Sequence, residues 1–365
     1  MKDGLDKQAI RRIATSIQQT GYPLDSKAFI RDASKGLSKL ALKQRVQHII
    51  TVLHRHLPDE FYQSAEILFN IKQYWDYGDR NDPLSGFAAW PVIDFSATYG
   101  LQQPETALEL LKHLTPLFSA EFAIRAFLIH HYEYTYQQLQ QWCGSPDEHV
   151  RRLVSEGTRP RLPWGQRLNQ YIQSPQPVIK LLNRLKDDPS LYVRRSVANN
   201  LNDISKDHPD TVIRLCRQWH RKPMPQREWI IKHACRSLIK AGHPECLTLL
   251  GFSNSPEINK PTMQLSRKTI NMGESLDFTV RIKSRANSAQ KLVVDYAVHY
   301  IKANGSSKAK MFKLKTFTLA PGDEICVSKT VSFKPITTRR YYPGRHIIEL
   351  FVNGNSVSKA KFLVH

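Results

Sequence analysis

The spacing of hydrophobic residues changes once along the chain, near residue 256. Before that point, apolar residues recur at intervals of three and four, in segments separated by short breaks that contain Pro, Gly or Asp. This spacing is typical of amphipathic helices. After it, apolar and polar residues alternate, most clearly at residues 276–282 and 312–317, as they do in half-buried strands. The sequence therefore predicts an α-helical part followed by a β part, joined by the polar, proline-containing segment 253–256.

A repeat is present within the helical part. Residues 147–154 reappear in similar form as residues 190–197, and more weakly as residues 228–234. Each copy follows an apolar helical segment, and these segments lie at residues 139–143, 178–185 and 212–219. A looser pair of helices is expected at residues 105–114 and 121–130. Because two-helix units of about forty residues are in the HEAT range and bury their apolar faces by stacking, we expect a HEAT-like α-helical repeat solenoid with one concave surface.

The β part predicts a small sandwich of about seven short strands. Asn304-Gly305 and Pro321-Gly322-Asp323 supply turns between the alternating runs, and Tyr342-Pro343-Gly344 forms a corner before a late strand. The spacing and the lack of a cysteine pair favour an immunoglobulin-like or fibronectin-like β-sandwich. The expected domains are a helical-repeat domain at residues 1–252, a linker at 253–260 and the sandwich at 261–365.

Charge narrows the class of partner. The chain has 53 Lys and Arg residues against 32 Asp and Glu residues, a formal net charge of +21. Nineteen of the basic residues and only seven of the acidic ones lie in the last 109 residues. Such a surplus favours a polyanion, and nucleic acid is the commonest one. An anionic membrane is the alternative, but no apolar run approaches the ~18 residues that a span requires. The sandwich is therefore expected to be an accessory DNA-binding domain.

Several kinds of site and compartment are excluded by motifs that the sequence lacks. The first twelve residues are highly charged and do not resemble a signal peptide, which predicts a cytoplasmic protein. The five cysteines are an odd number without a C-x-x-C pair, which indicates free thiols rather than structural zinc. There is no P-loop, nucleophile elbow or zinc-protease motif, and His131-Tyr132-Glu133 lacks the second half of the zinc-deaminase signature. We expect neither a metal nor a cofactor.

Paired arginines occupy the same place in successive repeats. Arg151-Arg152 and Arg194-Arg195 both lie in the second helix of a unit, so stacking would align them as a basic stripe. The alternative is that they pair with acidic side chains of the neighbouring repeat. The net charge of +21 leaves too few acids to neutralise all the arginines, which favours the stripe.

Polar residues gather where the repeat is interrupted. Residues 155–165 are expected to form a loop, and Trp164, between Pro163 and Gly165, is expected either to cap a repeat or to contact a ligand. Farther on, Ser196, Asn199 and Asp203 share one face of a predicted helix. Asn and Asp are poor helix formers, so their presence in mid-helix indicates a polar function.

Two glutamates complete the set of candidate carboxylates. Glu121 is expected to open a helix, and Glu156 lies near the start of the predicted loop. Each also has a purely structural interpretation as a pair partner, Glu121 with Arg125 and Glu156 with Arg152.

Several of these segments together resemble a known family. Those at residues 118–125, 150–164 and 192–209, with shorter ones at 42–49 and 86–92, are similar to the AlkC-type alkylpurine DNA glycosylases, HEAT-like-repeat proteins related to AlkD. The resemblance covers roughly residues 1–250. The C-terminal sandwich is a departure, since many relatives end with the repeats.

The resemblance implies a monofunctional DNA glycosylase of base excision repair. It would hydrolyse the N-glycosidic bond of cationic N-methylated bases such as 3-methyladenine and 3-methylcytosine in double-stranded DNA, without a deep base-flipping pocket. Glu121, Trp164 and Asp203 would carry the active site, with Glu156 as a fourth candidate. Arg159, Arg161 and the paired arginines would bind phosphates, together with Asn199. A monomer without membrane contact or an obligate protein partner is expected.

The sequence is also compatible with a second function. Basic charge and helical repeats fit equally well a non-catalytic HEAT-like scaffold that binds damaged or branched DNA. The carboxylates favour the enzyme, because a protein that only binds phosphates has no need of them.

Overall fold

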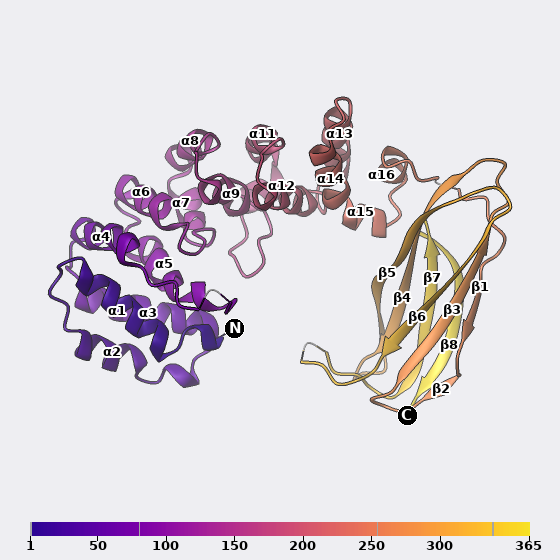
Figure 1. The fold of residues 1–365 in the computed structure, drawn as a ribbon, viewed down its shortest axis with the longest axis horizontal. Helices are drawn as coiled ribbons and strands as arrows, with labels where there is room; N and C mark the ends of the chain where they lie inside the picture. The colour runs from indigo at the N-terminus through magenta and orange to yellow at the C-terminus, as the bar shows by residue number, and fades with distance from the viewer. Residues whose placement is uncertain (1, 80, 254, 338) are drawn as a thin grey trace. The chain divides into compact units, whose positions relative to one another are not determined.

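The chain folds as a helical part followed by a β part, as the spacing predicts (Figure 1). The computed structural model describes residues 2–79, 81–253, 255–337 and 339–365. Asn254, in the predicted linker, is outside the described residues. Two compact units are present: a helical unit, made of Met1–His208 and Met224–Ala234, and a sandwich unit, made of Pro209–Pro223 and Cys235–His365.

The helical unit contains α-helices and short 3-10 helices (η). Its elements are η1 (Lys2–Gly4), α1 (Lys7–Gln19), α2 (Ser26–Ser34), η2 (Leu37–Lys39), α3 (Leu42–His56), α4 (Phe61–Asn70), η3 (Ile71–Tyr74), η4 (Ser85–Ala89), α5 (Trp90–Tyr99), α6 (Pro104–Leu114), α7 (Ile124–His130), α8 (Tyr132–Trp142), α9 (Glu148–Gly157), α10 (Asn169–Gln173), α11 (Gln176–Leu185), α12 (Leu191–Ile204) and α14 (Pro225–Ala234).

The predicted repeat is confirmed in these helices. The two strong copies become α9 and α12, and the weak echo becomes α14. Contacts join α8 to α9, α9 to α11 and α12, and α12 to α14, which is the stacking that a HEAT-like array requires. Asp6 and Asp147 cap their helices: Asp6 accepts from the backbone N–H groups of Gln8 and Ala9, and Asp147 accepts from that of His149.

Two predicted boundaries are wrong by a few residues. The helix expected from residue 121 begins at Ile124, so Glu121 lies in the preceding turn. The loop expected from residue 155 begins only after Gly157, because α9 continues that far. Ser155 and Glu156 are buried in this last turn, and the Thr158 hydroxyl ends the helix by donating to the Val154 carbonyl, at 2.8 Å.

The sandwich unit has two sheets. Their strands are β1 (Thr262–Leu265), β2 (Thr269–Ile270), β3 (Ser275–Lys283), β4 (Gln290–Ile301), β5 (Ser307–Leu319), β6 (Glu324–Ser332), β7 (Gly344–Val352) and β8 (Asn355–Val364). One sheet has the order β1-β3-β6 and the other β2-β8-β7-β4-β5. All pairings are antiparallel except that of β2 with β8.

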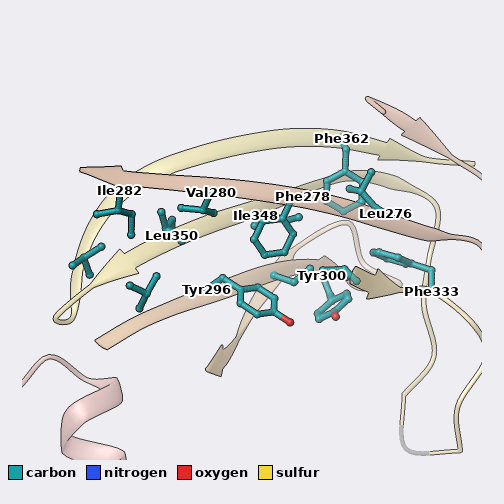
Figure 2. Close-up of a cluster of buried hydrophobic side chains, with 14 of the residues drawn as sticks. Leu276, Phe278, Val280, Ile282, Tyr296, Tyr300, Phe333, Ile348, Leu350 and Phe362 are labelled. Atoms are coloured by element: carbon teal, nitrogen blue, oxygen red, sulfur yellow. The ribbon is translucent and has the colours of Figure 1, made fainter. Parts of the chain in front are cut away.

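The alternating residues of the strands form the core between the two sheets (Figure 2). Leu276, Phe278, Val280 and Ile282 of β3 are all buried, as the alternation at 276–282 predicts. The predicted turns are confirmed as well: Gly305 and Gly322 have positive φ, at 75° and 74°, between β4 and β5 and between β5 and β6.

In the described part of the chain, the sandwich unit also includes the helices α13 (Pro209–His220), α15 (Arg236–Lys240) and α16 (Pro244–Leu249). Phe252 and Leu247 pack on Val293 of β4 in a small separate cluster. All five cysteines are free, as predicted, and only Cys326 is exposed. No helix in the described part of the chain has the length and apolarity needed to cross a membrane.

Candidate functional site

Glu121 is fixed in the turn before α7 by a side chain from another helix. Its Oε2 accepts hydrogen bonds from Arg152 Nη1 and from Ser119 Oγ, both at 2.7 Å. Arg152, on α9, also places its guanidinium 4.8 Å from the ring centre of Tyr192, on α12. Arg152 of α9 therefore holds this carboxylate, and α12 contacts the arginine through Tyr192. Its second oxygen, Oε1, has no hydrogen-bond partner within the described ranges.

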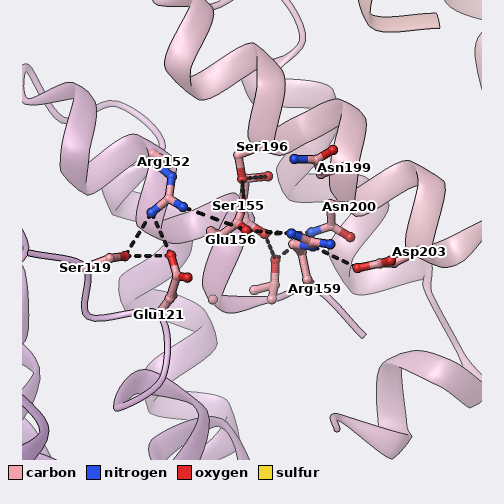
Figure 3. A network of polar contacts seen from close by, with 12 residues as sticks. Ser119, Glu121, Arg152, Ser155, Glu156, Arg159, Ser196, Asn199, Asn200 and Asp203 are labelled. Atoms are coloured by element: carbon pink, nitrogen blue, oxygen red, sulfur yellow. Dashed lines mark hydrogen bonds and ion pairs between the residues drawn. The ribbon is translucent and has the colours of Figure 1, made fainter. Parts of the chain in front are cut away.

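Glu156 and Asp203 are joined by one buried arginine (Figure 3). Arg159 donates from Nη1 to Glu156 Oε1 at 2.6 Å and from Nε to Asp203 Oδ2 at 2.8 Å. Arg152 Nη2 lies 3.8 Å from the same oxygen of Glu156. The groups form a continuous chain, Glu121–Arg152–Glu156–Arg159–Asp203, which we call the carboxylate–arginine network.

The three carboxylates of the network differ in how completely their oxygens are engaged. Glu156 uses its other oxygen to accept from Ser196 Oγ at 2.5 Å, so it is fully engaged. Asp203 Oδ1 accepts from Lys206 Nζ at 2.8 Å, and that lysine side chain is 46% exposed. Glu121 and Asp203 are thus the members with an open oxygen or a movable partner.

Charge balance explains why the arginines stay protonated in this site. Burial lowers the pKa of Arg152, but Glu121 and Glu156 outweigh it, and the net effect raises the pKa. The pKa of Arg159 is raised in the same way, by Glu156 and Asp203 against the cost of burial. Three carboxylates share two guanidinium groups, which leaves an excess of negative charge before Lys206 is counted.

A buried polar layer on α12 holds α9 in register. Ser196 Oγ also lies within hydrogen-bond distance of Ser155 Oγ, at 2.9 Å, where it can accept the Ser155 proton, and Asn200 Nδ2 donates to the Ser155 carbonyl at 2.7 Å. Ser196 and Asp203 of the predicted polar face therefore contact the carboxylate–arginine network, whereas Asn199 contacts another helix. Asn199 instead accepts through Oδ1 from His233 Nε2, at 3.2 Å. Asn200 was not among the predicted site residues, although a second Asn in mid-helix was a usable signal.

Arg125 is a positioning residue that the sequence interpretation missed. It was considered only as a partner of Glu121. In the structure it is almost fully buried and donates to the carbonyls of Gly157, Arg159 and Gln166, at 2.8, 2.9 and 2.6 Å. Burial, with Arg159 nearby, lowers its pKa to about 10. Arg125 therefore holds the loop that carries Arg159 and Trp164.

Trp164 lies in that loop with an unusual backbone. Its φ is 65°, in the left-handed region that bulky residues rarely adopt, and its side chain is 51% exposed. Lys43 Nζ, from α3, donates a hydrogen bond to its carbonyl oxygen. A left-handed backbone at a large exposed aromatic residue is kept only where the surroundings hold it, and it is typical of functional sites.

A cavity of about 240 Å³ adjoins Trp164. Residues of α3, of α5, of the turn before α7 and of the Trp164 loop line it, among them Lys43, Trp90, Asp94, Phe122 and Gln166. Phe122 directly follows Glu121, so one turn contributes both to this cavity and to the network.

Two of the four arginines of the predicted stripe, Arg151 and Arg152, are paired with acids, as the alternative interpretation has it. Arg151 makes a two-point contact with Asp188, at 2.6 and 3.0 Å. Arg161 does the same with Asp207, at 2.9 and 2.7 Å. Arg194 donates to the carbonyls of Asp188 and Pro189. Arg195 is exposed, and no ion pair is found for it across the described ranges.

The two structural interpretations of the glutamates have different outcomes. The pairing of Glu156 with Arg152 is present, and Glu156 lies closer still to Arg159. The pairing of Glu121 with Arg125 is wrong, because Arg125 is turned towards the carbonyls of the Trp164 loop. Within the described residues, no group of three or more His, Cys, Asp or Glu side chains is arranged to hold a metal ion.

Comparison with known proteins covers both parts of the chain. Residues 259–365 match the family model described as "Uncharacterised protein YhaZ, C-terminal Ig-like domain". The chain is 36% identical over 326 residues to the uncharacterized protein YhaZ of Bacillus subtilis (strain 168), which covers 89% of this chain and 88% of that protein.

A solved structure is similar over the whole length. It is the Pseudomonas fluorescens alkylpurine DNA glycosylase AlkC, bound to DNA that contains an abasic site analog. The TM-score is 0.93 and the sequences are 38% identical, over 100% of this chain and 99% of that one. The resemblance that the helical segments carry thus extends through the sandwich, which is no departure from this relative. The chain belongs to the family of the alkylpurine DNA glycosylase AlkC and of YhaZ.

Proposed function

We propose that the protein is a monofunctional DNA glycosylase that hydrolyses the N-glycosidic bond of cationic N-methylated bases, such as 3-methyladenine and 3-methylcytosine. It would act on double-stranded DNA in the cytoplasm, as a monomer and without a cofactor. The observation that supports this most strongly is the similarity, along the full length of both chains, to an alkylpurine DNA glycosylase.

The carboxylate–arginine network suits the chemistry of this reaction. A cationic base is already a good leaving group, so the protein needs no strong general acid. It must stabilise the positive charge that develops on the sugar and orient a water molecule. A carboxylate held in place before the reaction can do both. Glu121 has one open oxygen, and Asp203 has a partner, Lys206, that can move aside.

The arginines have a second role in this proposal. Arg152 and Arg159 hold the carboxylates, because each forms ion pairs with two of the three. Arg195 is exposed and is the simplest candidate for a phosphate contact, joined by Arg151, Arg161 and Arg194 where DNA competes for their partners. Trp164 would stack on the damaged nucleotide, where an aromatic face attracts a cationic base by ~1–2 kcal/mol.

The test is direct release of bases. Duplex DNA treated with a methylating agent is incubated with the full chain, and the released bases are separated by chromatography. We expect 3-methyladenine and 3-methylcytosine in the released fraction and none without protein. If the chain binds the DNA but releases no base, the proposed reaction is overturned and the non-catalytic scaffold becomes the better description.

A further inference from the structure

Two different side chains hold the two oxygens of Asp203. Oδ2 accepts from Arg159 Nε at 2.8 Å, and that arginine is buried. Oδ1 accepts from Lys206 Nζ at 2.8 Å, and the lysine side chain is 46% exposed. An ion pair with one partner in water is weak, because solvent screens it and the flexible side chain loses entropy when it is held. Lys206 is therefore the partner that Asp203 can lose.

The charge of the carboxylate–arginine network balances only with Lys206 in place. The three carboxylates of the network carry three negative charges, and its two arginines carry two positive charges. Lys206 supplies the third positive charge. If the lysine leaves, one net negative charge remains, and Oδ1 of Asp203 is the oxygen that is uncovered. A fixed negative charge is what stabilises the positive charge on the sugar in the proposed reaction.

A DNA phosphate is a suitable second partner for Lys206. The lysine lies in the turn after α12, and its ammonium group makes one hydrogen bond among the described residues, that to Asp203. An ammonium group has three N–H donors, so it can also donate elsewhere. One residue further on, Asp207 holds Arg161, a predicted phosphate ligand, at 2.9 and 2.7 Å. Phosphates repeat closely along duplex DNA, so a backbone that contacts Arg161 also brings a phosphate towards Lys206.

We propose that Lys206 exchanges Asp203 for a DNA phosphate when the duplex binds. In the free protein the lysine covers Oδ1 and neutralises the network. In the complex it binds the phosphate, which leaves Oδ1 open and the network negatively charged. The inference rests on the proposed function for what the open oxygen then does, which is to face the sugar of the damaged nucleotide. Lys206 acts through Asp203, so it is a positioning residue.

A lysine suits this exchange better than an arginine. Asp203 is only 2% exposed, and a buried carboxylate without its partner is costly in the free protein. An uncovered carboxylate would also repel the DNA as it approaches. A lysine on its flexible stem can cover the carboxylate and then turn to a phosphate, whereas an arginine holds a carboxylate by two parallel hydrogen bonds. Lys206 therefore keeps Asp203 paired until DNA takes the lysine.

The first experiment measures binding without catalysis. Affinities of the full chain for duplex DNA that contains an abasic site analog are measured by fluorescence anisotropy between about 50 and 200 mM salt. Lys206→Met should reduce the slope of log K against log salt concentration by about 0.9, so that the wild type loses roughly threefold more affinity than the variant over this range. Lys206→Arg keeps the charge and should keep the slope.

A matched control separates this lysine from others that pair with acids. Lys112 lies three residues after Glu109 on α6, with the two charged groups 3.9 Å apart and the lysine side chain 39% exposed. Lys206 stands in the same sequence relation to Asp203 and has similar exposure. Lys112→Met should therefore keep the wild-type slope. An unchanged slope in Lys206→Met, or an equal reduction in Lys112→Met, overturns the inference.

The exchange itself is tested by a double-mutant cycle with Asp203→Asn. If the phosphate must draw Lys206 away from a carboxylate, removal of the carboxylate ends this competition. Lys206→Met should then cost about two- to fivefold more affinity in the Asp203→Asn background than in the wild type. Thermal unfolding verifies that Asp203→Asn is folded, and if it is not, the salt slopes decide alone. Equal losses in both backgrounds overturn the exchange even if bases are released from DNA. The expected pattern in a chain that releases no base keeps the exchange and overturns the proposed reaction.

Discussion

Single side chains of the carboxylate–arginine network carry more than one task. Arg159 neutralises Glu156 and Asp203 at once and is itself only 7% exposed. Arg125 fixes the loop through backbone carbonyls alone. The sequence could identify the polar residues, because poor helix formers and an isolated Trp are visible as anomalies. Apart from the pair of Glu156 with Arg152 within α9, it could not assign their partners, since pairing across helices depends on how α9 and α12 pack.

Removal of Arg159 should therefore destabilise the protein strongly. Arg159→Met keeps the aliphatic part of the side chain but leaves two buried carboxylates without their shared partner, at a cost of about 3–5 kcal/mol in the free energy of unfolding. Arg161→Met breaks a more exposed pair, with Asp207, and should cost about 1 kcal/mol or less. Urea titration of both variants gives the comparison. Equal losses would show that Arg159 is not a buried electrostatic link.

Two helices of the sandwich unit end at a glycine. Gly242 and Gly251 both follow a helix, α15 and α16 respectively, with φ of 67° and 75°. In each case the glycine N–H and the next residue's N–H close the last helical turn. The two positions differ in their surroundings. A Cβ on Gly242 would lie 2.7 Å from the Cα of Gly354, whereas one on Gly251 meets nothing within 4 Å.

The same substitution should therefore lower the free energy of unfolding by different amounts at Gly242 and at Gly251. Gly251→Ala should lose about 1 kcal/mol of unfolding free energy from backbone strain alone. Gly242→Ala carries that strain plus an overlap with backbone atoms, and should lose roughly a further 1–3 kcal/mol. The midpoints of urea or thermal unfolding of the full chain measure both. Indistinguishable variants would contradict the close approach of the α15 end to the turn between β7 and β8.

Helices and strands could be predicted where the sequence carries a signal within a few residues. The repeats, β3 and β5 and their turns follow from periodicity and from glycines, which act over a few residues. The boundary at Ser155 could not be predicted, because burial against α12 and a capping hydroxyl decide where α9 ends. The cavity beside Trp164 was also missed, since segments far apart in the sequence line it.

At the scale of the whole molecule, the dominant property is charge. The last 109 residues hold nineteen basic and seven acidic residues, although that part is a small sandwich. Exposed Lys308, Lys310, Lys313 and Lys315 all lie on β5, which is an edge strand of its sheet. Edge-strand lysines also prevent pairing between molecules, so this cluster has a structural explanation besides DNA binding.

Salt dependence of DNA binding separates the two explanations. Replacing the four lysines of β5 with Ala should weaken binding to duplex DNA. It should also reduce the slope of log K against log salt concentration by about 0.9 for each lysine that neutralises a phosphate. The matched variant with four Arg keeps the charge and should keep the slope. An unchanged slope in the Ala variant would leave protection of the edge strand as the role of these lysines.

The central claim is that a buried carboxylate of the network supports cleavage of the glycosidic bond. The most direct measurement is the single-turnover release of 3-methyladenine from methylated duplex DNA by wild type, Asp203→Asn and Asp187→Asn. Asp187 also pairs with an arginine, Arg227, and belongs neither to the network nor to the cavity, so it controls for loss of a paired carboxylate. We predict that Asp203→Asn abolishes release while binding of the DNA persists, and that Asp187→Asn releases the base like the wild type. Full activity of Asp203→Asn would contradict the account.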